Sequence, residues 1–140
     1  MSKRKLLLPI ILLVAIVALA ACSGDEADIT LETEALDLGD VPNGTIATRD
    51  LTVRNTGEGR LVVDAISTSC GCTTATLDPM QIAPGESGTL HIEYDAGAHG
   101  PELTGPLVRQ VFINSNDPNQ PEVVVELAVN VTPARVGDGS

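Results

Sequence analysis

Short segments in which apolar and polar residues alternate recur about every ten to fifteen residues from Ile29 to Thr132, with turn-forming residues between them. The clearest of them is 122–132, where valine or leucine occupies every second position and would lie on one face. Alternation of this kind is typical of a β-strand with one buried face. Because no stretch of this region has the period of an amphipathic helix, the pattern predicts an all-β domain.

The number of such segments narrows the fold further. About seven short strands in roughly 105 residues, joined by polar turns, are typical of an immunoglobulin-like antiparallel β-sandwich. A small β-barrel is the alternative architecture. Tyr94 and Phe112 are the only aromatic residues of the chain, and tryptophan is absent. The core of the sandwich is therefore expected to consist of aliphatic side chains.

The strands also carry predictions about side-chain direction. In 60–67, strict alternation would place Leu61, Val63 and Ala65 on one face of the strand and Ile66 on the opposite face. In the later strands, the side chains expected to share a face are Leu90, Ile92 and Tyr94, and then Val111 and Ile113.

The first 21 residues have the layout of a secretory signal peptide. Three basic residues at 3–5 precede an apolar run at 6–19, which is short for a membrane span of about 20 residues. The segment 19–22 (Leu-Ala-Ala-Cys) resembles the lipobox of bacterial lipoproteins, in which the cysteine is acylated and becomes the new N-terminus. The sequence therefore predicts a lipid on Cys22. An ordinary cleaved signal peptide or an uncleaved anchor is the alternative.

These features divide the chain into four parts. We expect a lipoprotein signal peptide at 1–21, a short tether at 22–28, an immunoglobulin-like domain at 29–133 and a flexible tail at 134–140. The protein would be exported and anchored by its lipid to the cell membrane or to the outer membrane. Ser23 follows the lipidated cysteine, where many Gram-negative lipoproteins of the inner membrane carry aspartate, so in such a cell we expect the outer membrane.

Charge argues against nucleic acid as a partner. The formal net charge is −11, and removal of the signal peptide with its three basic residues makes it −14. The cations that remain are five arginines, set against 19 acidic residues. Such a field repels polyanions. Because the acidic residues are scattered along the sequence, we interpret them as a solvated surface.

Cys70 and Cys72 are the chemically distinctive residues of the domain. Once Cys22 carries the lipid they are the remaining pair, and an even number of cysteines in an oxidising compartment favours a disulfide. Residues two apart in a strand point to the same face, and Gly71 would let the backbone bend so that the sulfurs meet. The ring would be strained and easily reduced. It would also stabilise the fold little, because it closes almost no chain.

Three interpretations of this pair stay open at the level of sequence. It is a structural disulfide or dithiol at a strand bend, a reversible redox pair, or part of a soft-metal site for an ion such as Cu(I). A redox pair needs a nearby cation, for which Arg60 and Arg109 are the candidates. The candidate metal ligands are Cys70, Cys72, Met80, His91 and His99. Apart from copper no cofactor is expected, and both histidines are otherwise interpreted as surface residues and Met80 as a packing residue.

Four short motifs occur in an order and at a spacing that resemble one bacterial family. They are Asn55-Thr56-Gly57, Ser69-Cys70-Gly71-Cys72-Thr73, Pro84-Gly85-Glu86-Ser87-Gly88 and Ser115-Asn116-Asp117-Pro118. From Leu36 to Val131 the chain resembles domain of unknown function 1573, an exported family similar to the immunoglobulin-like ASH and major-sperm-protein sandwiches. The resemblance implies the fold. It carries no catalytic residue, because the biochemical role of the family is unassigned.

Recognisable catalytic motifs are absent from the sequence. It has neither a glycine-rich phosphate loop nor a G-x-S-x-G nucleophile elbow. We therefore expect a protein that is not an enzyme: a lipid-anchored binding or scaffolding module whose partners are the membrane and an envelope protein or glycan. The alternative is a thiol-redox or copper-binding protein that uses Cys70 and Cys72.

Overall fold

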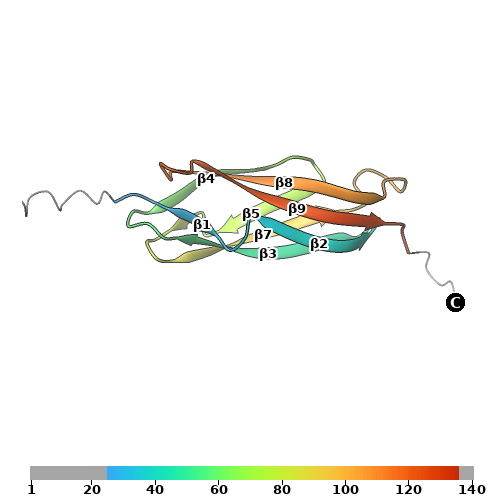
Figure 1. Ribbon diagram of the computed structural model, residues 1–140, viewed down its shortest axis with the longest axis horizontal. Coiled ribbons are helices and arrows are strands. Elements are labelled where there is room, and N and C mark those ends of the chain that lie inside the picture. The colour runs from blue at the N-terminus through green and yellow to red at the C-terminus, as the bar shows by residue number, and fades with distance from the viewer. Residues whose placement is uncertain (1–24, 136–140) are drawn as a thin grey trace, which may run out of the picture.

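The computed structural model describes residues 25–135, and in this part of the chain nine β-strands form two packed sheets (Figure 1). The strands are β1 (Ile29–Leu31), β2 (Ala35–Pro42), β3 (Ile46–Asn55), β4 (Leu61–Thr68), β5 (Thr73–Asp78), β6 (Gln81–Ile82), β7 (Ser87–Asp95), β8 (Gly105–Ser115) and β9 (Glu122–Thr132). One sheet has the order β1, β3, β7, β5, and the other has the order β2, β9, β8, β4, β6. The predicted all-β sandwich is therefore confirmed.

The described region holds nine strands where the sequence predicted about seven. Two of them are short: β1 has three residues, and β6 has only two, which is too few to show alternation. β1 and β2 lie in different sheets and are joined by residues 32–34, so the N-terminal part of the chain contributes an edge strand to each sheet.

One strand pair departs from the predicted antiparallel arrangement. β2 runs parallel to β9, with Ala35 opposite Glu126 and Pro42 opposite Thr132. The chain passes from one sheet to the other after β1 instead of turning back in a hairpin, and β2 therefore runs in the same direction as β9. Alternation in the sequence shows which side chains share a face, but it does not show the direction of the neighbouring strand.

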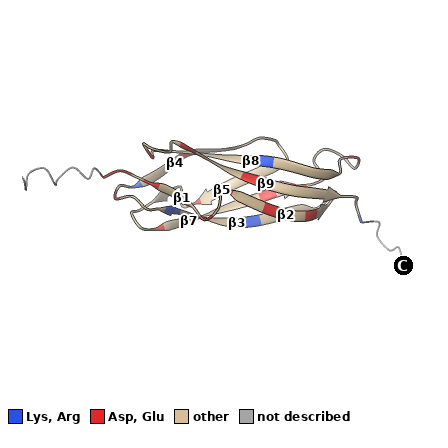
Figure 2. Ribbon diagram, viewed as in Figure 1, with Lys and Arg blue, Asp and Glu red and all other residues tan. Residues whose placement is uncertain are grey.

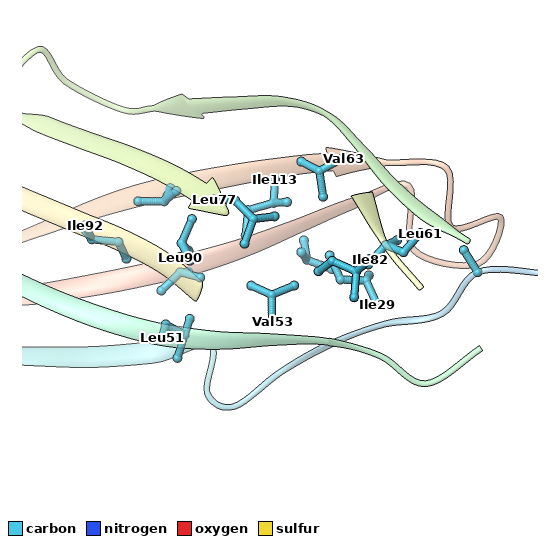
Figure 3. Close-up of a cluster of buried hydrophobic side chains, with 14 of the residues drawn as sticks. Ile29, Leu51, Val53, Leu61, Val63, Leu77, Ile82, Leu90, Ile92 and Ile113 are labelled. Atoms are coloured by element: carbon cyan, nitrogen blue, oxygen red, sulfur yellow. The ribbon is translucent and has the colours of Figure 1, made fainter. Parts of the chain in front are cut away.

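Side chains from both sheets fill the space between them in two clusters. The larger cluster, drawn in Figure 3, is aliphatic throughout, as predicted. Each fully buried valine, leucine or isoleucine of this kind contributes roughly 1.5–3 kcal/mol relative to an exposed one. The smaller cluster contains the single tyrosine and one of the cysteines. Its buried members are Leu38, Val41, Cys72, Tyr94, Ala96, Val129 and Val131.

The observed β4 corrects the side-chain directions predicted for 60–67. The register between β4 and β8 shifts between Val63 and Ala65. A bulge of this kind changes the face on which the following side chains lie. Ala65 is consequently exposed, and Ile66 packs against the larger cluster instead.

The buried side chain of Asn55 fastens the N-terminal segment to the sandwich. Asn55 Oδ1 accepts hydrogen bonds from the N–H groups of Gly57 (3.0 Å) and Asp28 (3.3 Å), and Asn55 Nδ2 donates to the carbonyl oxygen of Gly59 (2.7 Å). Residues 25–28, which the sequence pattern placed in a tether, therefore pack against the turn between β3 and β4.

The chain enters the sandwich at one end and leaves it at the other (Figure 1). β1 pairs with the last residues of β3, at the entry end. The connection from β4 to β5 lies at the opposite end, because Thr73 pairs with Tyr94 near the end of β7. The two cysteines in that connection are therefore far from the point at which the N-terminal segment joins the domain.

Several predictions concern residues outside 25–135, namely the signal peptide at 1–21, the lipid on Cys22 and the last five residues of the tail. Within the described range, no helix is long and apolar enough to cross a membrane. Figure 2 shows that acidic positions are spread over strands and loops along the sandwich.

Candidate functional site at the cysteine turn

Residues 69–72, which we call the cysteine turn, join β4 in one sheet to β5 in the other. The Ser69 N–H donates to the carbonyl oxygen of Gln110 (2.9 Å), and Ser69 Oγ accepts a hydrogen bond from the Gln110 N–H (3.0 Å). Thr68 Oγ1 donates to the carbonyl oxygen of Cys70 (3.0 Å). These bonds hold the turn against β8 and against the end of β4.

The sulfurs of Cys70 and Cys72 are joined in a disulfide. Their Cα atoms lie 5.3 Å apart, within the usual range of about 4.4–6.8 Å, because the chain turns here instead of running extended. The chain bends at Gly71 as expected, but the bend uses no conformation reserved for glycine. The φ angle of Gly71 is not positive, and a Cβ added to it would meet no atom within 4 Å outside the two neighbouring residues.

The two cysteines differ in exposure. Cys72 is 2% exposed and belongs to the smaller cluster. Cys70 is only partly buried and packs at the margin of that cluster, beside the exposed Gly71. A reagent from solution therefore reaches Cys70 more easily than Cys72.

Three hydrogen-bond donors face the sulfurs. Arg109 Nε lies 3.3 Å from Cys72 Sγ, and the Cys72 N–H lies 3.3 Å from Cys70 Sγ. Thr73 Oγ1 lies 3.6 Å from Cys70 Sγ and 3.7 Å from Cys72 Sγ. Sulfur in a disulfide is a weak acceptor, whereas a thiolate carries a full negative charge, so these donors stabilise a reduced thiolate more than the disulfide.

Arg109, and not Arg60, is the cation that the structure places at the cysteine turn. The antiparallel pairing of β4 with β8 reaches Thr68 and Val111, and its continuation brings Arg109 beside the turn. Arg60 directly precedes β4 and therefore lies at the other end of that strand. Sequence position alone could not separate the two arginines, because the choice depends on which strand pairs with β4.

His99 is the histidine that lies near the disulfide. One of its ring nitrogens and the sulfurs of Cys70 and Cys72 all lie within 4.8 Å of one another. The imidazole is exposed and belongs to the loop between β7 and β8. Three of the five candidate ligands are thus brought together at one end of the sandwich.

The structure places the other two candidate ligands elsewhere. The exposed His91 lies on β7, where its Nδ1 is 2.6 Å from Asp50 Oδ1 and its Nε2 is 3.6 Å from Glu93 Oε1. The hydrogen bond to Asp50 raises the pKa of this imidazole above its usual value. Met80 follows β5 at the end away from the cysteine turn, and it is 39% exposed, so the prediction that it packs under the following turn is wrong.

Tyr94 also lies in this region. The sequence predicted an inward position for it and gave it no functional role. Its side chain is fully buried in the smaller cluster, together with Cys72, and its hydroxyl has no hydrogen-bond partner among the described residues. Burial raises the pKa of Tyr94, although the charge of Arg109 opposes that effect. The available sequence signal was a tyrosine, which carries a polar group, at an inward position of a strand.

Sequence comparison identifies the family. A family model described as "Protein of unknown function (DUF1573)" matches residues 29–131. The chain belongs to this family. The resemblance drawn from the four motifs is therefore correct at the level of the family. No match is found among curated protein sequences.

Solved structures extend the comparison to the fold. A protein of unknown function from Porphyromonas gingivalis W83 is similar at 25% identity and a TM-score of 0.71, over 79% of this chain and 50% of that one. The chain thus spans half the length of that protein. The ASH/PapD-like domain 7 of human CEP192 (8% identity, TM-score 0.59, 82% and 92% covered) and the E. coli chaperone DraB (13%, 0.54, 75% and 56%) share the fold.

Proposed function

We propose that this protein is a non-enzymatic binding or scaffolding module of the cell envelope. Residues 1–21 export it, and a lipid on Cys22 holds it at the cell membrane or the outer membrane. The domain then offers a strand edge to an envelope partner. Of the two partner classes expected, protein and glycan, an open strand edge favours an extended protein segment.

The open edge of β5 carries this proposal. β5 ends its sheet and, among the described strands, pairs with β7 alone. The Asp95 N–H donates to the carbonyl oxygen of Cys72 (2.8 Å). Because bonding alternates along an antiparallel pair, the backbone groups of Ala75 and Leu77 point away from β7. β5 contains no lysine or proline, the residues that commonly protect a free edge.

The position of this edge also supports the proposal. β5 begins at the cysteine turn, at the end of the sandwich away from the entry of the N-terminal segment. A lipid attached before that segment would leave this end free to meet a partner. The acidic surface would keep the domain away from anionic head groups.

Site-specific photo-crosslinking in cells tests the proposal. A photoreactive residue at Thr76, exposed on β5, should give a discrete crosslinked partner, whereas the same residue at Thr89, exposed on the central strand β7, should not. The pair Thr74→Lys and Ala75→Lys should abolish the crosslink, because lysine blocks edge pairing. Circular dichroism checks that the variants fold. Equal crosslinking from both sites would contradict edge binding.

The cysteines provide an internal control for this function. The double variant Cys70→Ser, Cys72→Ser should lower the stability of the domain and leave partner capture intact. Loss of capture with an unchanged fold would show that binding depends on the thiol chemistry and would count against a purely structural module.

A second candidate function is thiol–disulfide exchange, which the contact between Arg109 Nε and Cys72 Sγ favours. A partner thiolate attacks the accessible Cys70 Sγ, a new sulfur–sulfur bond forms, and the bond between Cys70 and Cys72 breaks. The electron pair leaves on Cys72 Sγ, where the Arg109 guanidinium and the Thr73 hydroxyl stabilise the negative charge. Attack by the Cys72 thiolate on Cys70 reverses the step and releases the partner thiolate.

Titration of the full chain in glutathione redox buffers tests this candidate. Exchange should appear as reversible conversion between disulfide and dithiol. After acid quenching, mass spectrometry should locate the mixed disulfide with glutathione at Cys70. Absence of exchange would rule out this candidate function. A mixed disulfide mainly at Cys72 would contradict the proposal that the partner thiolate attacks Cys70 Sγ.

A further inference from the structure

We propose that the reduced cysteine turn binds one Cu(I) ion through the thiolates of Cys70 and Cys72 and the imidazole of His99. The proposal shares with the second candidate function the need for a reduced cysteine pair, because the sulfurs become ligands only after the disulfide is reduced. The observation behind it is that these three donor atoms lie within 4.8 Å of one another in the oxidised form. Opening the disulfide moves the sulfurs apart, which makes room for an ion between them and the imidazole.

The chemistry balances with an external dithiol as reductant. The dithiol gives two electrons and two protons to the disulfide and becomes a disulfide itself, while Cys70 and Cys72 become thiols. Cu(I) then displaces both thiol protons to water. Two thiolates and one Cu(I) carry a net charge of −1, and the guanidinium of Arg109, whose Nε faces Cys72 Sγ, compensates it.

The donor set selects a soft ion. Thiolate ligands favour Cu(I), zinc and iron–sulfur clusters over hard cations, and imidazole is compatible with copper. Structural zinc sites usually take four protein ligands. Among the described residues the structure offers three at this turn, since Met80 and His91 lie elsewhere. Two soft thiolates and one imidazole, without a fourth protein ligand, suit Cu(I) better than a structural zinc ion.

The surroundings of the sulfurs are those of a thiolate site. Arg109 Nε, the Cys72 N–H and Thr73 Oγ1 all face sulfur, and such outer donors orient and stabilise the ligands of a metal. The buried hydroxyl of Tyr94 lies in the same cluster as Cys72 and has no partner among the described residues. A buried polar group without a partner needs an explanation.

Access to the site is open from one side. His99 and Gly71 are exposed, and Cys70 is partly exposed, whereas Cys72 is buried against aliphatic side chains. An ion can therefore enter from solvent, and the buried side limits contact of the bound ion with water. A donor protein that carries Cu(I) could approach this end of the sandwich without meeting the lipid anchor.

Anaerobic Cu(I) titration of the full chain in detergent tests the proposal. The protein is reduced with a phosphine, and Cu(I) is supplied in competition with a colorimetric chelator. One equivalent should bind, and X-ray absorption should show two sulfur donors and one nitrogen donor. The variant His99→Asn should weaken binding by about tenfold or more, because a ligand contributes at least as much as its outer-sphere partners.

Two controls make the titration specific. His91→Asn changes the other histidine of the chain, which lies away from the turn, and should leave the affinity unchanged. Cys70→Ser, Cys72→Ser keeps Cys22 and measures any binding elsewhere. Equal affinities of the wild type and His99→Asn, or of the wild type and the double serine variant, would overturn the proposal.

The same preparations separate this proposal from the exchange candidate. If glutathione reduces the disulfide and the reduced protein binds no Cu(I), the metal site is wrong and exchange stands. If glutathione leaves the disulfide intact while phosphine-reduced protein binds Cu(I) with two sulfurs and one nitrogen, the exchange candidate is wrong and the metal site stands.

Discussion

Arg109 Nε lies 3.3 Å from Cys72 Sγ, although the two residues are 37 positions apart in the chain. The same guanidinium donates from its Nη1 atom to the carbonyl oxygen of Val108 (2.9 Å), which fixes its direction. A partly buried cation is thus held against the more buried sulfur of the pair. The guanidinium stabilises a neutral disulfide sulfur little, whereas it stabilises the negative charge of a thiolate strongly.

The first prediction follows from that contact. Arg109→Gln should make the disulfide harder to reduce, shifting the equilibrium with glutathione toward the oxidised form by about three- to tenfold. A hydrogen bond to a charged group contributes about 1.5–3 kcal/mol, discounted here because the guanidinium is partly exposed. Arg49→Gln is the matched control, since Arg49 Nη1 also donates to the preceding carbonyl oxygen, of Thr48. An equal shift in both variants would contradict a role for the contact with sulfur.

Two glycines should differ widely in their tolerance of alanine. Gly71→Ala should change the free energy of unfolding by less than about 0.5 kcal/mol, because an added Cβ meets no atom within 4 Å outside the two neighbouring residues and the φ angle is not positive. In Gly57→Ala the Cβ would lie 2.6 Å from the backbone nitrogen of Asp28, and we expect a loss of about 2 kcal/mol or more. Urea unfolding with matched m-values measures both. A large loss in Gly71→Ala would show that the turn does need glycine.

The fold could be predicted from the sequence because alternation records burial directly. Leu90, Ile92 and Tyr94 share a buried face, as expected, and so do Val111 and Ile113. The parallel pairing of β2 and the bulge in β4 could not be predicted in this way. Both are decided by how strands meet across the sandwich, and a strand looks the same in sequence whichever way its neighbour runs.

Only part of the candidate site could be predicted from the sequence, for the same reason. Cys70 and Cys72 are close in sequence, so their pairing could be considered without a fold. His99 and Arg109 reach them only because β7, β8 and β4 end or pair at the same end of the domain. Before that topology is known, His91 and His99 are equivalent candidates.

Asp117 should make the stability of the domain depend on pH. Burial alone would raise the pKa of this carboxyl, but the backbone N–H groups of Ile29 (2.9 Å), Asn119 (2.8 Å) and Gln120 (3.0 Å) outweigh burial and hold the pKa below its usual value. A lowered pKa in the folded state adds stability above the unfolded value of about 3.9, and this stability is lost as the pH falls below it.

The variant Asp117→Asn checks the pH dependence. It should be less stable than the wild type by about 1–2 kcal/mol at neutral pH, because the charged acceptor of three N–H groups is lost. The difference should shrink as the pH falls below about 4, where the carboxyl of the unfolded chain becomes protonated while the folded-state carboxylate, whose pKa is lower, is still charged. Asp64→Asn, at an exposed position of β4, is the control. A difference that is constant from pH 7 to pH 3 would contradict the role of the charge.

The variant Tyr94→Phe tests whether the tyrosine hydroxyl interacts with the cysteines after the disulfide is reduced. In the oxidised protein its buried hydroxyl has no partner among the described residues, so Tyr94→Phe removes a desolvated polar group without removing the ring. The variant should be more stable than the wild type by about 1 kcal/mol in urea unfolding, since an unsatisfied buried group costs about 1–3 kcal/mol. If the hydroxyl donates to a thiolate after reduction, the gain should disappear in reduced protein. A gain of equal size in both redox states would show that the hydroxyl does not interact with the cysteines.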